Sequence, residues 1–165
     1  MGGFAADASR DGSISTLEAA AAWRWDDAEL LRERGRTAAA LYWFGFTIEF
    51  RLTAALLRLH GYSPSAPVSL RDIDHLRSEA RRLQLMGTEP HDLQGLARYL
   101  LRLRTDVAVR TRKSLGIELL DAASNAYAQW RPRMRYKPLV PTAAQFRLGL
   151  DAALWFRERY NDLWR

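Results

Sequence analysis

The residues with the clearest chemical potential in this sequence are a group of basic side chains in its second half. They are Arg110, Arg112, Lys113, Arg131, Arg133, Arg135 and Lys137, with Tyr136 among them. Arginine donates paired hydrogen bonds to phosphate, and an adjacent aromatic ring can stack on a nucleic-acid base. In an extended segment, the alternating spacing from 131 to 135 would place three arginines on one side. The pattern predicts a surface that binds a phosphate-bearing partner.

The charge of the chain is concentrated around these residues. The 165 residues carry a formal net charge of +6. Residues 98–137 contain ten basic and three acidic side chains, so this stretch alone accounts for the excess. A localised basic face is typical of proteins that bind phosphates. The alternative is a solvated face whose arginines pack along their stems or complement the end of a helix.

The N-terminal segment contains a second set of candidate ligands. Residues 7–18 follow the order of an EF-hand loop, in which Gly12 supplies the turn. The oxygen ligands would be Asp7, Ser9, Asp11, Ser13 and Glu18. Hard oxygen ligands at alternate positions suit calcium, so the order predicts a weak Ca²⁺ site. The alternative is a capping box, formed by Ser15 and Glu18, at the end of a flexible tail.

Three further polar residues adjoin apolar sequence. Glu49 interrupts the most apolar stretch of the chain, and because an unpaired buried carboxylate is costly, we expect it to pair, for example with an arginine. Its alternative role is a polar contact at a dimer or ligand site. His91 and Asp92 fall in the first turn of an expected helix, where Asp92 complements the helix dipole. We expect His91 to hydrogen-bond to a neighbouring helix rather than to bind a ligand.

The composition excludes several classes of chemistry. The chain has no cysteine, which rules out disulfides, thiolate zinc sites and cysteine nucleophiles. Its three histidines leave few members for a histidine-based site. The N-terminus has no secretory-signal pattern, and the longest apolar run is shorter than the roughly 20 residues needed to span a bilayer. We therefore expect a cytoplasmic protein with no membrane partner and, apart from calcium, no cofactor.

Helices must position these residues, because apolar side chains recur at helical spacing and no long segment alternates with period two. We expect helices over about 15–34 with a break near 26, 37–60, 70–85, 90–103, 115–130 and 142–160. The second is apolar nearly all round and should be central, with Gly45 where a neighbour approaches closely. Pro90 fits the first turn of the fourth helix, and Thr142 can cap the last.

Short loops between helices favour antiparallel neighbours. The predicted fold is therefore all-α, a single-domain antiparallel bundle of about five to six helices. The bundle would cover residues 16–165. A tail over residues 1–15 would precede it, with the EF-hand-like loop continuing to residue 18.

Three segments of the chain carry a family resemblance. The first is residues 25–31 (WDDAELL), followed by Gly35, and the second is the aromatic-rich helix over 40–57 with Glu49 near its end. The third is residues 91–93 with Leu96, followed later by Arg135-Tyr136. In this order they resemble the HEPN family, small helical bundles of prokaryotic defence and toxin–antitoxin systems. The resemblance covers most of residues 25–160, and residues 70–85 would form an additional helix.

The resemblance implies a homodimer and, in many members, a nucleotidyltransferase partner. Ribonuclease members carry an arginine separated from a histidine by four to six residues, and no arginine lies five to seven positions before His60, His75 or His91. RNA cleavage normally needs a histidine to move protons. We therefore expect a bundle without the ribonuclease motif that binds RNA, a nucleotide or a nucleotide-handling protein. The alternatives are a bundle for protein–protein interaction and a divergent ribonuclease that uses other residues.

Overall fold

The computed structural model describes residues 12–130, 132, 134 and 140–165. Within them the chain forms six α-helices and a short 3₁₀-helix, η2 (Tyr160–Leu163). Gly12 and Val68 form an isolated antiparallel bridge, and the described residues contain no strand. The predicted all-α helical bundle is therefore confirmed. Its helices are α1 (Ile14–Glu33), α2 (Thr37–Leu59), α3 (Leu70–Arg82), α4 (Leu93–Asp106), α5 (Lys113–Gln129) and α6 (Ala143–Arg159).

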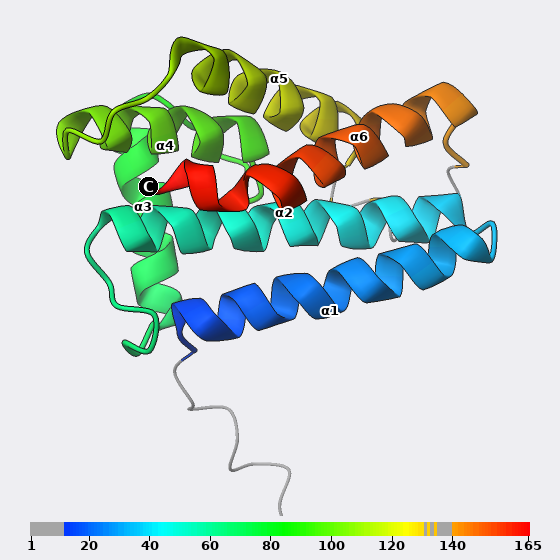
Figure 1. Cartoon of the computed structure of the whole chain (residues 1–165), viewed down its shortest axis with the longest axis horizontal. Helices are drawn as coiled ribbons and strands as arrows, with labels where there is room; N and C mark the ends of the chain where they lie inside the picture. The colour runs from blue at the N-terminus through cyan, green and yellow to red at the C-terminus, as the bar shows by residue number, and fades with distance from the viewer. Residues whose placement is uncertain (1–11, 131, 133, 135–139) are drawn as a thin grey trace, which may run out of the picture.

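Helix α2 is the centre of the bundle, as its sequence predicts. It packs along α1 on one side and contacts α4, α5 and α6 on the other (Figure 1). Because apolar residues surround its axis, side chains on several faces are buried, among them Phe44, Leu52 and Leu56. Even so, none of the helices in the described ranges combines the length and apolarity needed to cross a bilayer.

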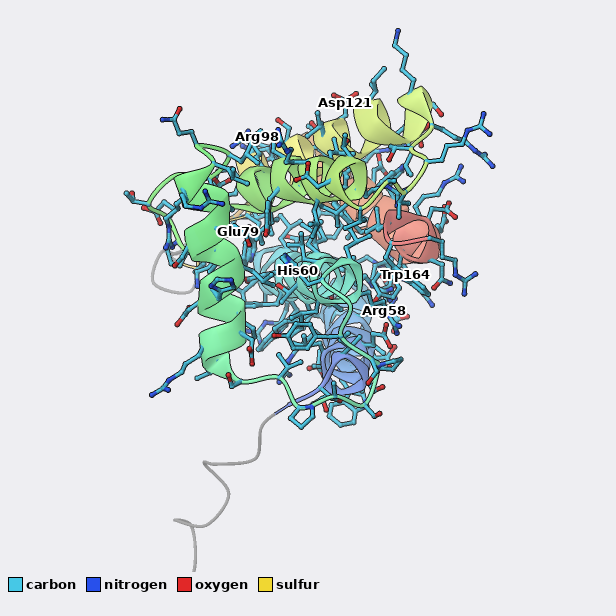
Figure 2. The ribbon with its side chains drawn as sticks, turned by 90° about the vertical axis from the view of Figure 1, so that its left-hand side faces the viewer. Arg58, His60, Glu79, Arg98, Asp121 and Trp164 are labelled. Carbon is cyan, nitrogen blue, oxygen red and sulfur yellow. The ribbon has the colours of Figure 1, made fainter. Side chains whose placement is uncertain are left out.

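Helix α3 stands across the other helices. Both views show its axis nearly perpendicular to those of α1 and α2 (Figures 1 and 2). Its buried apolar surface is small, since Leu76 and Ala80 are its buried residues. Helix α3 therefore departs from the antiparallel arrangement that short connections predict.

Side chains at the helix starts explain where several helices begin. Thr142 accepts a hydrogen bond from the backbone nitrogen of Gln145 and forms a capping box with it, which confirms the predicted cap of α6. Ser13 caps α1 by accepting from Thr16 N, and Asp92 caps α4 by accepting from Gly95 N. Each cap satisfies an amide group that the helix itself leaves without a partner.

Four local predictions are wrong. Ser15 does not form a capping box with Glu18, because its hydroxyl donates to the carbonyl of Pro64 at 3.0 Å and Ser13 caps the helix instead. Helix α1 continues through residue 26 without a break. Helix α3 ends at Arg82, three residues early, where the chain turns through a left-handed residue at position 84. Residues 90 and 91 precede α4, because the cap at position 92 starts that helix later than Pro90 suggests.

Candidate nucleic-acid interface

Arginine side chains from three chain segments surround one surface groove. Arg110 and Arg112 come from the connection between α4 and α5, Arg159 from the end of α6, and Arg165 from the residues after η2. We call this hollow, which has a volume of about 680 Å³, the arginine groove. The rest of its lining consists of Arg104, Ser114, Leu115, Glu118 and Asp162.

Arg104 joins the walls of the arginine groove from beneath. It is 1% exposed, and its Nη1 donates to the carbonyl oxygens of Asp162 and Leu163 at 2.8 and 2.7 Å. Its Nη2 donates to the carbonyls of Arg110 and Arg165, both at 3.1 Å. Burial lowers the pKa of the Arg104 guanidinium, against the opposing charge of Asp162. Because backbone carbonyls take its donors, Arg104 positions the groove rather than serving as a free ligand.

Two of the predicted phosphate-binding residues lie in this groove, Arg110 and Arg112. Lys113 is also exposed, and as the first residue of α5 it lies next to the lining. The remaining predictions, for Arg131, Arg133, Arg135, Tyr136 and Lys137, lie outside the described residues. Two described residues of that stretch, at positions 132 and 134, have 3₁₀ rather than extended conformation.

Sequence reasoning missed Arg104, Arg159 and Arg165. A signal existed for Arg104, because it follows Leu93 and Leu100 at helical spacing on the buried stripe of α4, where a charge needs partners. No comparable signal existed for Arg159 or Arg165. Both enter the groove only because the end of α6 packs beside the connection that precedes α5.

The arginine groove carries a net positive charge. Its two carboxylates already have partners: Glu118 accepts from Trp155 Nε1 at 3.1 Å, and Asp162 lies 3.4 Å from Arg159 Nη1. Helix α5 begins at the groove, and a helix N-terminus adds a partial positive charge. Exposed guanidinium groups in this arrangement can donate to several oxygens of one anion or of neighbouring phosphates.

Glu49 pairs as its sequence context predicts. The carboxylate is buried in α2 and accepts from Arg77 Nη2 of α3 at 3.0 Å. It also lies 2.8 and 2.9 Å from Nδ1 of His91, which confirms that His91 hydrogen-bonds to a neighbouring helix. The rings of Phe46 and Trp130 meet the His91 ring edge-on. The buried charge is therefore balanced by a cluster that connects three chain segments.

Two of the predicted calcium ligands are described by the structure. Ser13 caps α1, and Glu18 Oε1 accepts from Arg58 Nη2 at 2.7 Å and from the hydroxyl of Tyr160. Asp7, Ser9 and Asp11 lie outside the described residues. Within the described part of the chain, no three His, Asp or Glu side chains are grouped for metal binding. The calcium site stays a prediction, and Glu18 has a structural role that the sequence did not reveal.

Comparison with known proteins identifies no relative of this chain. The chain matches no family model, no curated protein and no solved structure. The resemblance to HEPN proteins therefore stays a prediction from the sequence motifs.

Proposed function

We propose that this chain is an HEPN-like helical bundle that binds RNA or a nucleotide through the phosphates. The observation that carries the proposal is the arginine groove, where Arg110, Arg112, Arg159 and Arg165 meet from three segments. Guanidinium groups recognise phosphate by paired hydrogen bonds, and a groove of this kind attracts polyanions over a distance. The sequence motifs add the setting, a defence or toxin–antitoxin-like module.

Salt-dependent RNA binding tests this proposal. Single-stranded RNA of mixed sequence is titrated with the parent protein and with an Arg110→Ala/Arg112→Ala variant at several salt concentrations. We expect weaker binding by the variant, and a plot of log K against log salt that is shallower by about 0.7 for each phosphate that the variant no longer binds. Fluorescence anisotropy with labelled RNA measures both quantities.

The matched control is an Arg71→Ala/Arg147→Ala variant, which removes the same charge from exposed positions on α3 and α6 outside the groove lining. We expect this control to bind RNA nearly as the parent does. Equally weakened binding by both variants would mean that net charge, and not the groove, causes binding. Absence of RNA binding by the parent would overturn the proposal.

The HEPN resemblance adds two partners to the proposal, a second copy of the chain and a nucleotidyltransferase-like protein. Sedimentation equilibrium of the purified protein tests the homodimer, since a monomer mass across the accessible concentrations would contradict it. A nucleotidyltransferase encoded by a neighbouring gene would support the second partner. Co-purification of the two gene products tests their association directly.

A divergent ribonuclease is a second candidate function. It is favoured by His91, because Glu49 holds Nδ1 of this ring and no described residue hydrogen-bonds to Nε2. A carboxylate in this position orients an imidazole for proton transfer. RNA cleavage by highly purified protein that is abolished in a His91→Gln variant would support this candidate. Intact RNA after incubation with the parent would leave binding as the function.

A further inference from the structure

Arg51 is a cation that none of the described carboxylates pairs with. It projects from α2, and its guanidinium lies over the ring of Tyr160, 5.0 Å from the ring centre. Its Nε is buried and has no hydrogen-bond partner, and none of the described carboxylates forms an ion pair with it. A partly buried charge without a counter-ion is unfavourable in the free protein.

Arg58 lies seven residues further along α2 and, unlike Arg51, has a carboxylate partner. It donates to Glu18 through Nε and Nη2 at 3.2 and 2.7 Å. Burial acts to lower the pKa of Arg58, but its bonds to Glu18 and Tyr160 outweigh burial and raise it. For Arg51, burial prevails and lowers the pKa. The acceptor capacity of Glu18 is directed to Arg58 and Tyr160, so at Arg51 the charge of Glu18 opposes the effect of burial on the pKa only in part.

A second arginine without a carboxylate partner lies close to Arg51. Arg157 of α6 is exposed and stacks over Trp25 of α1, 4.5 Å from the ring centre, and none of the described acids pairs with it. The charge of Arg157 also helps to lower the pKa of Arg51. Two cations that repel each other are therefore held together by the packing of α1, α2 and α6.

The stacking geometry leaves these arginines able to bind an anion. A guanidinium that lies over an aromatic ring uses its face for that contact, while its N–H donors point outward in its plane. Because Nε of Arg51 is buried, its two Nη groups are the in-plane donors that match the oxygens of a phosphate group. We propose that Arg51 and Arg157 form a second phosphate subsite, between α1 and α6, which holds a backbone phosphate of the same RNA strand that occupies the arginine groove.

Stacked side chains extend from the arginine groove toward the proposed subsite. The ring of Trp164 lies under Arg58 at 4.5 Å and under Arg165 at 5.0 Å, and Arg165 lines the arginine groove. Figure 2 shows Trp164 and Arg58 side by side between the end of the chain and α1. A strand that leaves the arginine groove past Arg165 therefore meets Arg58 and then Arg51. This inference rests on the proposed function, because it extends the RNA path.

The test measures two properties of an Arg51→Met variant. In RNA titrations we expect weaker binding and a salt dependence that is shallower by about 0.7, the value expected when one phosphate is no longer bound. In thermal unfolding without RNA we expect a melting temperature that is higher than the parent's, because the variant removes a charge that has no partner. An arginine with a purely structural role would instead lower the melting temperature when it is replaced.

Arg157→Met is the second variant, and it keeps the test decisive if Arg51→Met does not fold, because Arg157 is exposed. Its RNA titration should show the same shallower salt dependence. Arg147→Met is the matched control on the same helix, since Arg147 is exposed and lies 3.9 Å from Asp151. We expect the control to bind RNA as the parent does.

The outcomes separate this inference from the proposed function. If the Arg110/Arg112 variant loses affinity while Arg51→Met and Arg157→Met bind like the parent, the subsite is overturned and the RNA function stands. If the parent binds RNA and none of these variants changes binding, both the arginine groove and the subsite are overturned as the binding surface. Weaker binding in both sets, with Arg147→Met unchanged, supports one RNA path across the end of α6.

Discussion

The close approach of Trp130 to α2 depends on the absence of a side chain at position 45. Gly45 of α2 faces Trp130, and a Cβ atom added at position 45 would lie 2.2 Å from atoms of the indole ring. Trp130 is fully buried there and donates from Nε1 to the carbonyl of Tyr42 at 3.0 Å. The indole cannot withdraw without losing that bond. The close approach that the sequence predicts at Gly45 is therefore confirmed, and Trp130 is the neighbour.

We predict that Gly45→Ala lowers the free energy of unfolding by about 3 kcal/mol, because the added methyl group displaces a buried ring. Urea denaturation followed by circular dichroism measures the change. Gly116→Ala is the control, since its Cβ would lie 3.8 Å from Leu101, an ordinary contact distance. Alanine favours helix over glycine, so the control should be more stable than the parent by about 0.5–1 kcal/mol. Similar destabilisation of both variants would contradict the packing argument.

Arg104 supports a second prediction at the residue scale. In Arg104→Met the carbonyls of Asp162 and Leu163 lose their donors in the protein interior, and we expect a loss of about 2–4 kcal/mol in the free energy of unfolding. Chemical denaturation of the purified variant measures it. Arg102→Met on the same helix is the control, because Arg102 pairs with Asp106 at the surface. An exposed pair of this kind contributes about 0.5 kcal/mol or less.

Polar contacts hold helix α3 to the rest of the molecule. Only two of its apolar side chains are buried. Side-chain hydrogen bonds join Asp72 to Tyr62 at 2.9 Å, Arg77 to Glu49, and Glu79 to Tyr99 at 2.7 Å. Such bonds are directional, and removal of one partner leaves the other unsatisfied, which lowers the free energy of unfolding. Helix α3 should therefore be the element most sensitive to changes in single polar residues.

We predict that Glu49→Gln loosens α3. The change leaves Arg77 and His91 without their shared carboxylate, and we expect a loss of about 2–4 kcal/mol in the free energy of unfolding. Hydrogen exchange should accelerate in α3 more than in α1 and α2. Asp74→Asn is the control, because Asp74 contacts the same Arg77 but is exposed, and its effect should be within about 0.5 kcal/mol. Unchanged exchange in α3 would contradict this role of Glu49.

At the scale of the whole molecule, one hydrogen-bonded chain joins three helices. Tyr99 of α4 donates its hydroxyl proton to Glu79 of α3 at 2.7 Å. Because that proton is committed, the 2.8 Å contact between Tyr99 and His60 requires His60 Nε2 to donate. Burial lowers the pKa of His60, against the charge of Glu79, and burial likewise raises the pKa of Tyr99. The junction is therefore built for a neutral histidine.

This junction predicts how the stability of the whole molecule depends on pH. Since the pKa of His60 is below its ordinary value of 6.5, the unfolded chain binds this proton more readily than the folded protein. The contribution of His60 to stability is therefore present above pH 6.5 and declines as the pH falls below it. Thermal unfolding between pH 8 and pH 5.5 should show a flatter profile for His60→Gln than for the parent. Coincident profiles would contradict the assignment.

The order of the helices and several local details could be predicted from the residues alone. Helical spacing of apolar side chains indicates the six segments, and Thr142 indicates the start of α6. Glu49 predicts a polar partner, because burial of a lone carboxylate is unfavourable. These features depend on neighbours within a few residues, or on the free energy of burial of a single group. Both are properties of the sequence itself.

The tertiary structure alone decided which charges meet. Arg104 reaches the carbonyl of Leu163, 59 residues away, and Arg58 rather than Arg51 receives Glu18, 40 residues from Arg58. A period of 3.6 residues indicates which face of a helix is buried, but it does not indicate which helix covers that face or where along the axis the two helices meet. The basic pattern of the sequence marks Arg110 and Arg112, but long-range packing brings Arg159 and Arg165 to them and Arg157 to Arg51, and no local pattern predicts those meetings.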